Sequence, residues 1–187
     1  MTAGHCSKKG PFNPDGSVDF YHLPWGSPVG YRLIGQMAPP NMSVVDRGFI
    51  SKQNKNTGVT PSVRNTDDTE NPELHIIGTI DLDEDTIGRI VCISGYFTHV
   101  DCSRVLSVDD VIISASDIEY SGVVKIDHIG CEGDSGAPVF IGDQGTLPGI
   151  FIVGMLTGGK EAEGFCVVVP IKMLITDDIE LLTINNI

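Results

Sequence analysis

Residues Gly133-Asp134-Ser135-Gly136-Ala137 set one serine between an aspartate and a glycine, with a second glycine two positions earlier. Near the N-terminus, Thr2-Ala3-Gly4-His5-Cys6 supplies a histidine. A serine hydroxyl is a weak nucleophile until a base removes its proton, and histidine is the side chain whose pKa suits that task near neutral pH. Glycines allow the backbone to approach a substrate closely. The two stretches together predict acyl transfer by a Ser-His-Asp triad.

The order of these residues along the chain narrows the fold. The same triad geometry occurs on unrelated folds that differ in chain order. An α/β-hydrolase needs its histidine after the serine, but the last histidine is His128, and Ala137 stands where the second glycine of the nucleophile elbow belongs. A subtilisin-type order needs an aspartate before the histidine, and nothing acidic precedes His5. The order that remains is His, Asp, Ser.

Four stretches in this order carry a family resemblance. Thr2–Cys6 resembles the catalytic-histidine box, and Gly133–Pro138 the catalytic-serine box, of the trypsin/chymotrypsin superfamily of serine endopeptidases. Val91–Gly95 with Cys102 is similar to a disulfide-closed hairpin of the α-lytic/streptogrisin-type branch, and Gly154–Gly159 resembles the strand that binds substrate. These matches are spread over nearly the whole chain, and the branch is bacterial and fungal.

The resemblance implies an all-β fold of two antiparallel six-stranded β-barrels, of the chymotrypsin-like kind. We expect residues 1–50 to form a partial N-terminal barrel with His5, 51–72 a polar inter-barrel loop, and 73–187 a C-terminal barrel with Ser135. Short β-branched runs broken by Gly, Pro, Asn and Asp independently favour antiparallel β-structure.

Composition limits the partners. The chain has 187 residues and a formal net charge of −13, which argues against binding to nucleic acid or to anionic membrane surfaces. No apolar run approaches the roughly 20 residues that span a membrane. We expect a monomer that acts on a protein or peptide substrate.

The chain has five cysteines, an odd number. The resemblance implies disulfides Cys92–Cys102 and Cys131–Cys166, and hence an oxidising, extracellular compartment. It leaves Cys6, whose partner in the family lies on a strand before the histidine box. We therefore expect that the chain lacks its true N-terminus, including about two strands, one cysteine and a secretory signal. The first barrel would then be incomplete, and the chain as it stands poorly soluble or inactive. The alternative is a cytosolic protein with five thiols.

The triad's acid has to be chosen among many aspartates. Asp46 lies at the end of the apolar run Ser43-Val44-Val45 and before Gly48-Phe49-Ile50, a context that resembles the family's acid. The other candidates lie in polar stretches or turns and are read as solvated: Asp67, Asp68, Asp81, Asp83, Asp85, Asp109 and Asp110. Asp46 is therefore expected to orient His5.

The remaining site residues follow from the resemblance. The backbone N–H groups of Gly133 and Ser135 would form the oxyanion hole. Ile129, two residues before Cys131, would line the bottom of the specificity pocket, and Gly158 and Gly159 its walls, next to Thr157 on the substrate strand. The absence of an acidic residue at the pocket bottom favours an apolar or aromatic substrate side chain. No cofactor is required, and no Cys/His spacing predicts a metal.

One departure from the family concerns Asp134, whose buried carboxylate needs a partner. In the α-lytic branch the partner is an arginine directly after the first hairpin cysteine, where this chain has Ile93. Arg89 lies nearby in sequence, but the sequence does not assign it to Asp134. A different class of function is a catalytically inactive fragment or protease homologue that acts as a binding module. The intact set of His5, Asp46 and Ser135 argues against it.

Overall fold

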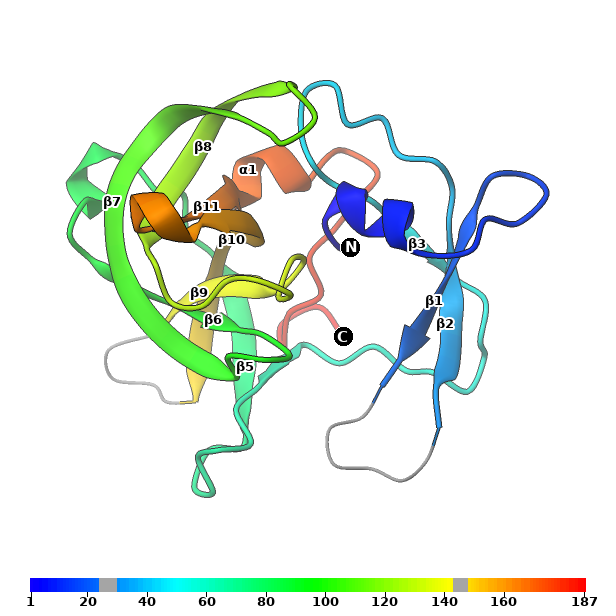
Figure 1. Cartoon of the computed structure of the whole chain (residues 1–187). Helices are drawn as coiled ribbons and strands as arrows, with labels where there is room; N and C mark the ends of the chain where they lie inside the picture. Colours follow the sequence, from blue (N-terminus) through cyan, green and yellow to red (C-terminus); the bar gives the residue numbers. More distant parts are fainter. Residues whose placement is uncertain (24–29, 143–147) are drawn as a thin grey trace. The chain divides into compact units, whose positions relative to one another are not determined.

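The computed structural model describes residues 1–23, 30–142 and 148–187. The chain divides into two compact units, Met1–Val59 and Thr60–Ile187. Strands make up most of the regular secondary structure of both units (Figure 1). Among the described residues, no helix is both long and apolar enough to cross a membrane.

The first unit contains the 3₁₀ helix η1 (Gly4–Lys9) and the strands β1 (Val18–His22), β2 (Arg32–Met37) and β3 (Ile50–Lys52). The strands form an antiparallel sheet in the order β1-β2-β3. Val18 and Met37 face each other across β1 and β2, and both are buried. This apolar pair fixes the register, because a shift by one residue would expose it.

The second unit is organised around a closed ring of six strands. These are β6 (Ile90–Ser94), β7 (Val100–Ile113), β8 (Glu119–Asp127), β9 (Pro138–Gly142), β10 (Gly149–Lys160) and β11 (Phe165–Pro170). They follow one another in the order β11-β8-β7-β6-β9-β10, and an additional β10–β11 pairing joins the two ends. All six neighbouring pairs are antiparallel. The ring is therefore a six-stranded β-barrel without free edges among its own strands.

Shorter elements surround this barrel. Strand β5 (Glu73–Thr79) runs parallel to the start of β10, and β4 (Ser62–Arg64) pairs with β5. The short helices are η2 (Glu84–Thr86), η3 (Glu161–Glu163) and α1 (Ile171–Leu174).

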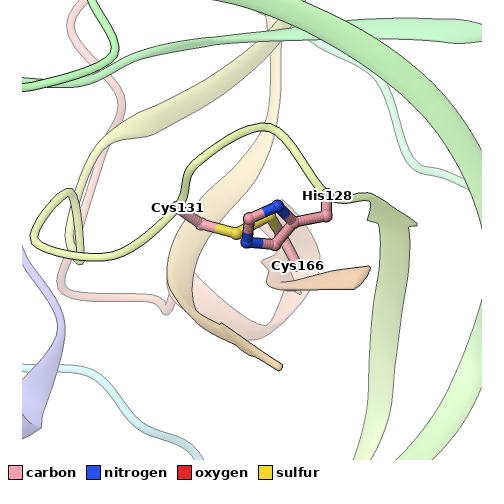
Figure 2. A group of neighbouring side chains, drawn as sticks. All are labelled: His128, Cys131 and Cys166. Carbon is pink, nitrogen blue, oxygen red and sulfur yellow. A yellow bond between two sulfur atoms is a disulfide. The ribbon is translucent and has the colours of Figure 1, made fainter. Parts of the chain in front are cut away.

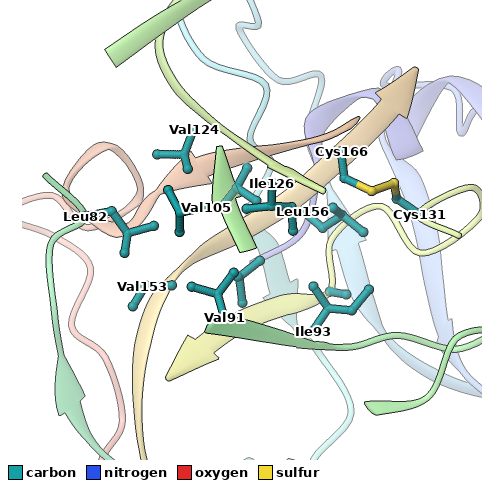
Figure 3. Close-up of a cluster of buried hydrophobic side chains, with 13 residues drawn as sticks. Leu82, Val91, Ile93, Val105, Val124, Ile126, Cys131, Val153, Leu156 and Cys166 are labelled. Atoms are coloured by element: carbon teal, nitrogen blue, oxygen red, sulfur yellow. A yellow bond between two sulfur atoms is a disulfide. The ribbon is translucent and has the colours of Figure 1, made fainter. Parts of the chain in front are cut away.

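Side chains from the inner face of the barrel form its core (Figure 3). Along β6, Val91 and Ile93 are fully buried, whereas Ile90 is half exposed, as the alternation of a strand requires. Their neighbours in the core include Val105, Ile126, Val139 and Leu156. The core thus draws on β6, β7, β8, β9 and β10, and it fixes the ring on which the serine loop is mounted.

The predicted all-β class is confirmed, and the second unit has the predicted six-stranded barrel. The predicted polar loop 51–72 is partly wrong. Residues 51–52 pair with β2, and Ser62–Arg64 forms β4, in which Val63 is buried opposite Leu74. The two units meet in sequence between Val59 and Thr60. The sequence did not predict β4, because Asn and Thr surround it and it buries only one apolar side chain.

A cross-strand ion pair on this barrel gives a pH-dependent stability. The Asp110 carboxylate on β7 accepts hydrogen bonds from the Ser107 hydroxyl at 2.7 Å and from the Lys125 ammonium on β8 at 2.9 Å. These contacts lower the pKa of Asp110 from 3.8 to about 2. The stabilisation is complete above pH 3.8 and is lost as the pH falls toward 2, because the folded pKa lies below the unfolded one.

We expect Asp110→Asn to lower the free energy of unfolding by about 1 kcal/mol or less at pH 6, because the pair is partly exposed. The difference from wild type should shrink between pH 4 and pH 2 in urea titrations. Asp127→Asn, at the exposed end of β8, is the matched control. A difference that is constant over this pH range would contradict the assignment.

Candidate active site

His5 and Asp46 lie close together in the first unit, although 41 residues separate them in sequence. His5 stands on η1, and two backbone hydrogen bonds between Thr2 and Gly48 tie the start of the chain to the segment after Asp46. The N–H of Thr2 donates to the Gly48 carbonyl at 3.0 Å, and the N–H of Gly48 donates to the Thr2 carbonyl at 2.8 Å. This bridge sets the histidine beside the carboxylate.

Both oxygens of Asp46 contact His5. The ring Nδ1 lies 2.6 Å from Oδ2, and the backbone N–H of His5 donates to Oδ1 at 2.9 Å. Asp46 is only 8% exposed. Since an ionised carboxylate only accepts hydrogen bonds, Nδ1 must carry a proton, and the lone pair of the neutral ring is left on Nε2. Nε2 is therefore the ring atom of His5 that can accept a proton.

Close packing around this pair depends on two glycines that sequence analysis did not single out. A Cβ on Gly4 would lie 2.7 Å from the Arg47 carbonyl oxygen. A Cβ on Gly48 would overlap the Met37 thioether. At Gly4 the chain therefore approaches the Arg47 backbone at a distance that leaves no room for a side chain, and at Gly48 any larger residue would displace Met37.

Ser135 lies in the second unit, in a tight turn before β9. Gly133 and Gly136 on either side have φ values of +89° and +97°, which are unfavourable for other residues. The N–H of Ala137 donates to the Asp134 carbonyl at 2.9 Å and closes the turn. This is the conformational reason for glycine at both positions of the serine box.

Strand β10 anchors the serine turn. The N–H of Gly136 donates to the Leu156 carbonyl at 2.7 Å, and the N–H of Leu156 donates to the Ala137 carbonyl at 2.9 Å. The Ser135 hydroxyl lies 3.3 Å from the carbonyl oxygen of Thr157. The serine side chain is therefore next to the strand that the sequence predicts to bind substrate.

The predicted pocket residues lie around the Cys131–Cys166 disulfide. Gly159 pairs with Cys166, and a Cβ on Gly159 would lie 2.6 Å from the Cys131 sulfur. A Cβ on Gly158 would meet nothing within 4 Å, so space is open there. Ile129 is partly buried against the barrel core. The β10–β11 register shifts between Leu156 and Gly158, and such irregularities of pairing occur often beside active sites.

Both disulfides that the resemblance implied are present. Cys92 and Cys102 face each other across β6 and β7 with Cα atoms 4.0 Å apart, a separation shorter than the usual minimum. Cys131 and Cys166 have Cα atoms 6.1 Å apart. Within the described residues Cys6 takes part in no disulfide, and burial raises the pKa of its thiol.

Solved structures with the same architecture are proteases. Cellulomonas bogoriensis chymotrypsin superposes with a TM-score of 0.65 at 18% identity, over 92% of this chain and 79% of the other. Thermobifida fusca protease A gives a TM-score of 0.61 at 22% identity, with 92% and 77% coverage. A glutamic acid-specific serine protease gives 0.67 at 18% identity, with 92% and 80% coverage. The chain has the chymotrypsin-like fold. The sequence matches no protein-family model, and the comparison with curated proteins gave no match.

A group of side chains that can bind metal lies at the Cys131–Cys166 disulfide. His128, Cys131 and Cys166 place their ligand atoms within 4.8 Å of one another (Figure 2). Both sulfurs are joined in the disulfide and therefore are not thiolates, the form that binds metal. The buried Nε2 of His128 has no hydrogen-bond partner among the described residues. We assign no metal to this group while the disulfide is intact.

The structure supplies the partner that the sequence lacked for Asp134. Its carboxylate accepts hydrogen bonds from the turn between β6 and β7: from the N–H of Phe97 at 2.8 Å, and from the N–H and hydroxyl of Thr98 at 2.9 and 2.7 Å. Arg89 lies directly before β6, at the end of the strand away from this turn. Ile93, at the position of the family's arginine, is fully buried in the core.

The contacts of Asp46 predict a protected Nδ1 proton on His5. Proton NMR should show a low-field Nδ1–H resonance that disappears in Asp46→Ala, because that variant loses the acceptor. The matched control is Asp67→Ala. Asp67 lies 2.7 Å from Nδ1 of His99, but that pair is exposed, so its proton exchanges rapidly with water. A low-field signal that survives in Asp46→Ala would rule out the proposed tautomer.

Proposed function

We propose that this protein is a serine endopeptidase, which hydrolyses peptide bonds through an acyl-enzyme intermediate. The observation that carries the proposal is the buried Asp46 carboxylate. One of its oxygens contacts the His5 ring, and the other accepts a hydrogen bond from the His5 backbone N–H. The Ser135 turn, with its two positive-φ glycines, and the chymotrypsin-like fold support the same chemistry. In this proposal His5, Asp46 and Ser135 form the catalytic triad.

The proposed reaction begins when Ser135 Oγ attacks the substrate carbonyl carbon and His5 Nε2 takes the hydroxyl proton. Asp46 stabilises the imidazolium that results. His5 then gives the proton to the leaving amine, the C–N bond breaks, and an ester links the substrate to Ser135. Water, activated by His5, hydrolyses this ester and restores the hydroxyl.

The negative oxygen of each tetrahedral intermediate would accept hydrogen bonds from the backbone N–H groups of Gly133 and Ser135. Loss of one such donor costs about 3 kcal/mol of transition-state stabilisation in related enzymes. Within the described residues, the N–H of Gly133 donates no hydrogen bond. It is therefore available to a substrate.

The substrate side chain before the scissile bond would enter the space beside Ile129, Gly158 and Gly159. Gly158 leaves this space open, because a Cβ there would meet nothing within 4 Å, and Ile129 offers an apolar surface. We propose that an apolar or aromatic side chain is preferred, with the substrate backbone alongside Thr157. The two disulfides favour an oxidising compartment, and we propose that the protein is secreted.

We expect a fluorophosphonate to label the wild-type protein, expressed from its whole coding sequence, at Ser135, and Ser135→Ala to remain unlabelled. Peptide hydrolysis should fall by several orders of magnitude in Ser135→Ala and in His5→Ala, because each removes one part of a unit that acts together. Ser121→Ala, on an exposed position of β8, is the matched control and should react like wild type.

Mass spectrometry of the labelled peptide identifies the modified residue. Wild-type rates of peptide hydrolysis in Ser135→Ala would overturn the proposed function, as would labelling at another serine.

A further inference from the structure

The Asp134 carboxylate is buried at the base of the serine turn and accepts hydrogen bonds from uncharged donors. Asp134 is 3% exposed. Among the described residues, no lysine, arginine or histidine forms an ion pair with it. An ionised carboxylate in such a place is tolerated only if strong hydrogen-bond donors satisfy its oxygens. The donors described above, two backbone N–H groups and one hydroxyl, fill this role.

All three donors belong to one short turn, Gly95–His99, between β6 and β7. The N–H of Gly95 donates to the His99 carbonyl at 2.9 Å and closes the turn. The Cys92–Cys102 disulfide joins the two strands below it. The turn therefore reaches Asp134 as a closed unit whose N–H groups point at the carboxylate, an arrangement that suits an anion.

The turn and the serine loop also fit together sterically. A Cβ on Gly95 would overlap the Asp134 carboxylate and lie 2.7 Å from the Thr98 hydroxyl oxygen. A Cβ on Gly133 would lie 2.7 Å from the Phe97 ring. The turn thus approaches the serine loop at Gly95, and the serine loop approaches the turn at Gly133. One of these glycines is the proposed oxyanion donor.

We propose that Thr98 is a positioning residue for peptide hydrolysis, and this inference rests on the proposed function. The Thr98 hydroxyl, with the N–H groups of Phe97 and Thr98, takes the place of a cationic partner for Asp134. Asp134 lies between Gly133 and Ser135, so fixing its side chain limits the movement of the backbone that carries both proposed oxyanion donors. Thr98 itself does not touch substrate.

The side chain of Thr98 can be altered without removing either backbone donor. Thr98→Val keeps the shape and loses only the hydroxyl. We expect kcat to fall about 10- to 100-fold with KM nearly unchanged, the range for losing a hydrogen bond to a charged group. Affinity for a peptide boronic acid, which forms a tetrahedral adduct, should fall in parallel with kcat. Thr98→Ser should retain most of the activity, because it keeps the hydroxyl.

The closing experiment compares wild type, Thr98→Val, Thr98→Ser and the control Thr79→Val on the full chain. Thr79 lies at an exposed position of β5. Each protein is first titrated with a fluorophosphonate, and kcat, KM and boronic acid affinity follow. An unlabelled wild type overturns the proposed function and the role of Thr98 with it. A labelled wild type with unchanged kcat in Thr98→Val overturns the role of Thr98 alone.

A second variant keeps the proposal testable if Thr98→Val folds poorly. Asp134→Asn leaves Thr98 intact but replaces one accepting oxygen by an N–H₂ group. That group cannot accept a hydrogen bond from the donors that now contact Asp134. It should lower kcat and boronic acid affinity together, with KM nearly unchanged. Where all variants fold, the loss in the double variant should be smaller than the product of the single losses, because both act on one contact. Multiplicative losses, or wild-type kcat in Asp134→Asn, would overturn the proposal.

Discussion

Strand β10 is the constraint on which the second unit depends. It pairs with β9 on one side and with β11 on the other, and the latter pairing closes the ring of six strands. The same strand hydrogen-bonds to Gly136 and Ala137 through Leu156, and its Thr157 carbonyl lies beside the Ser135 hydroxyl. The same strand therefore closes the barrel and holds the serine turn in place. A rigid strand positions a reactive side chain more exactly than a loop alone can.

Two carboxylates next to proposed catalytic residues are buried, and each is satisfied by different hydrogen-bond donors. Asp46 accepts from a histidine ring and from a backbone N–H of the same residue. Asp134 accepts hydrogen bonds from uncharged donors on a separate turn. The first arrangement gives the histidine its tautomer, and the second fixes the backbone around Ser135. The partner of Asp46 is a histidine, which can gain and lose a proton. The donors to Asp134 are backbone N–H groups and a hydroxyl, which keep their protons.

The sequence predicted the contact between His5 and Asp46, which the structure contains, whereas the catalytic roles of His5, Asp46 and Ser135 stay a prediction. His5 and Ser135 lie in short motifs, and Asp46 was chosen because apolar residues flank it on both sides. The cysteine pairings came from the resemblance. Strand β4 was not predicted, because Ser62–Arg64 has only three residues and buries only Val63. The partner of Asp134 was missed for a different reason: Thr98 lies 36 residues away, and no periodicity links a turn to a loop.

The glycines show why such contacts escape a reading of the sequence. Gly95 has no positive φ and looks like an ordinary turn residue after β6. Its role is to leave space, because a Cβ there would occupy the volume of the Asp134 carboxylate. Gly4 and Gly159 do the same beside the Arg47 carbonyl and the Cys131 sulfur. At these positions the sequence records the absence of a side chain, and only the structure says which group takes its place. The close approach of backbone to a buried polar or sulfur atom is thus the common feature of the segments that surround His5, Asp134 and the pocket disulfide.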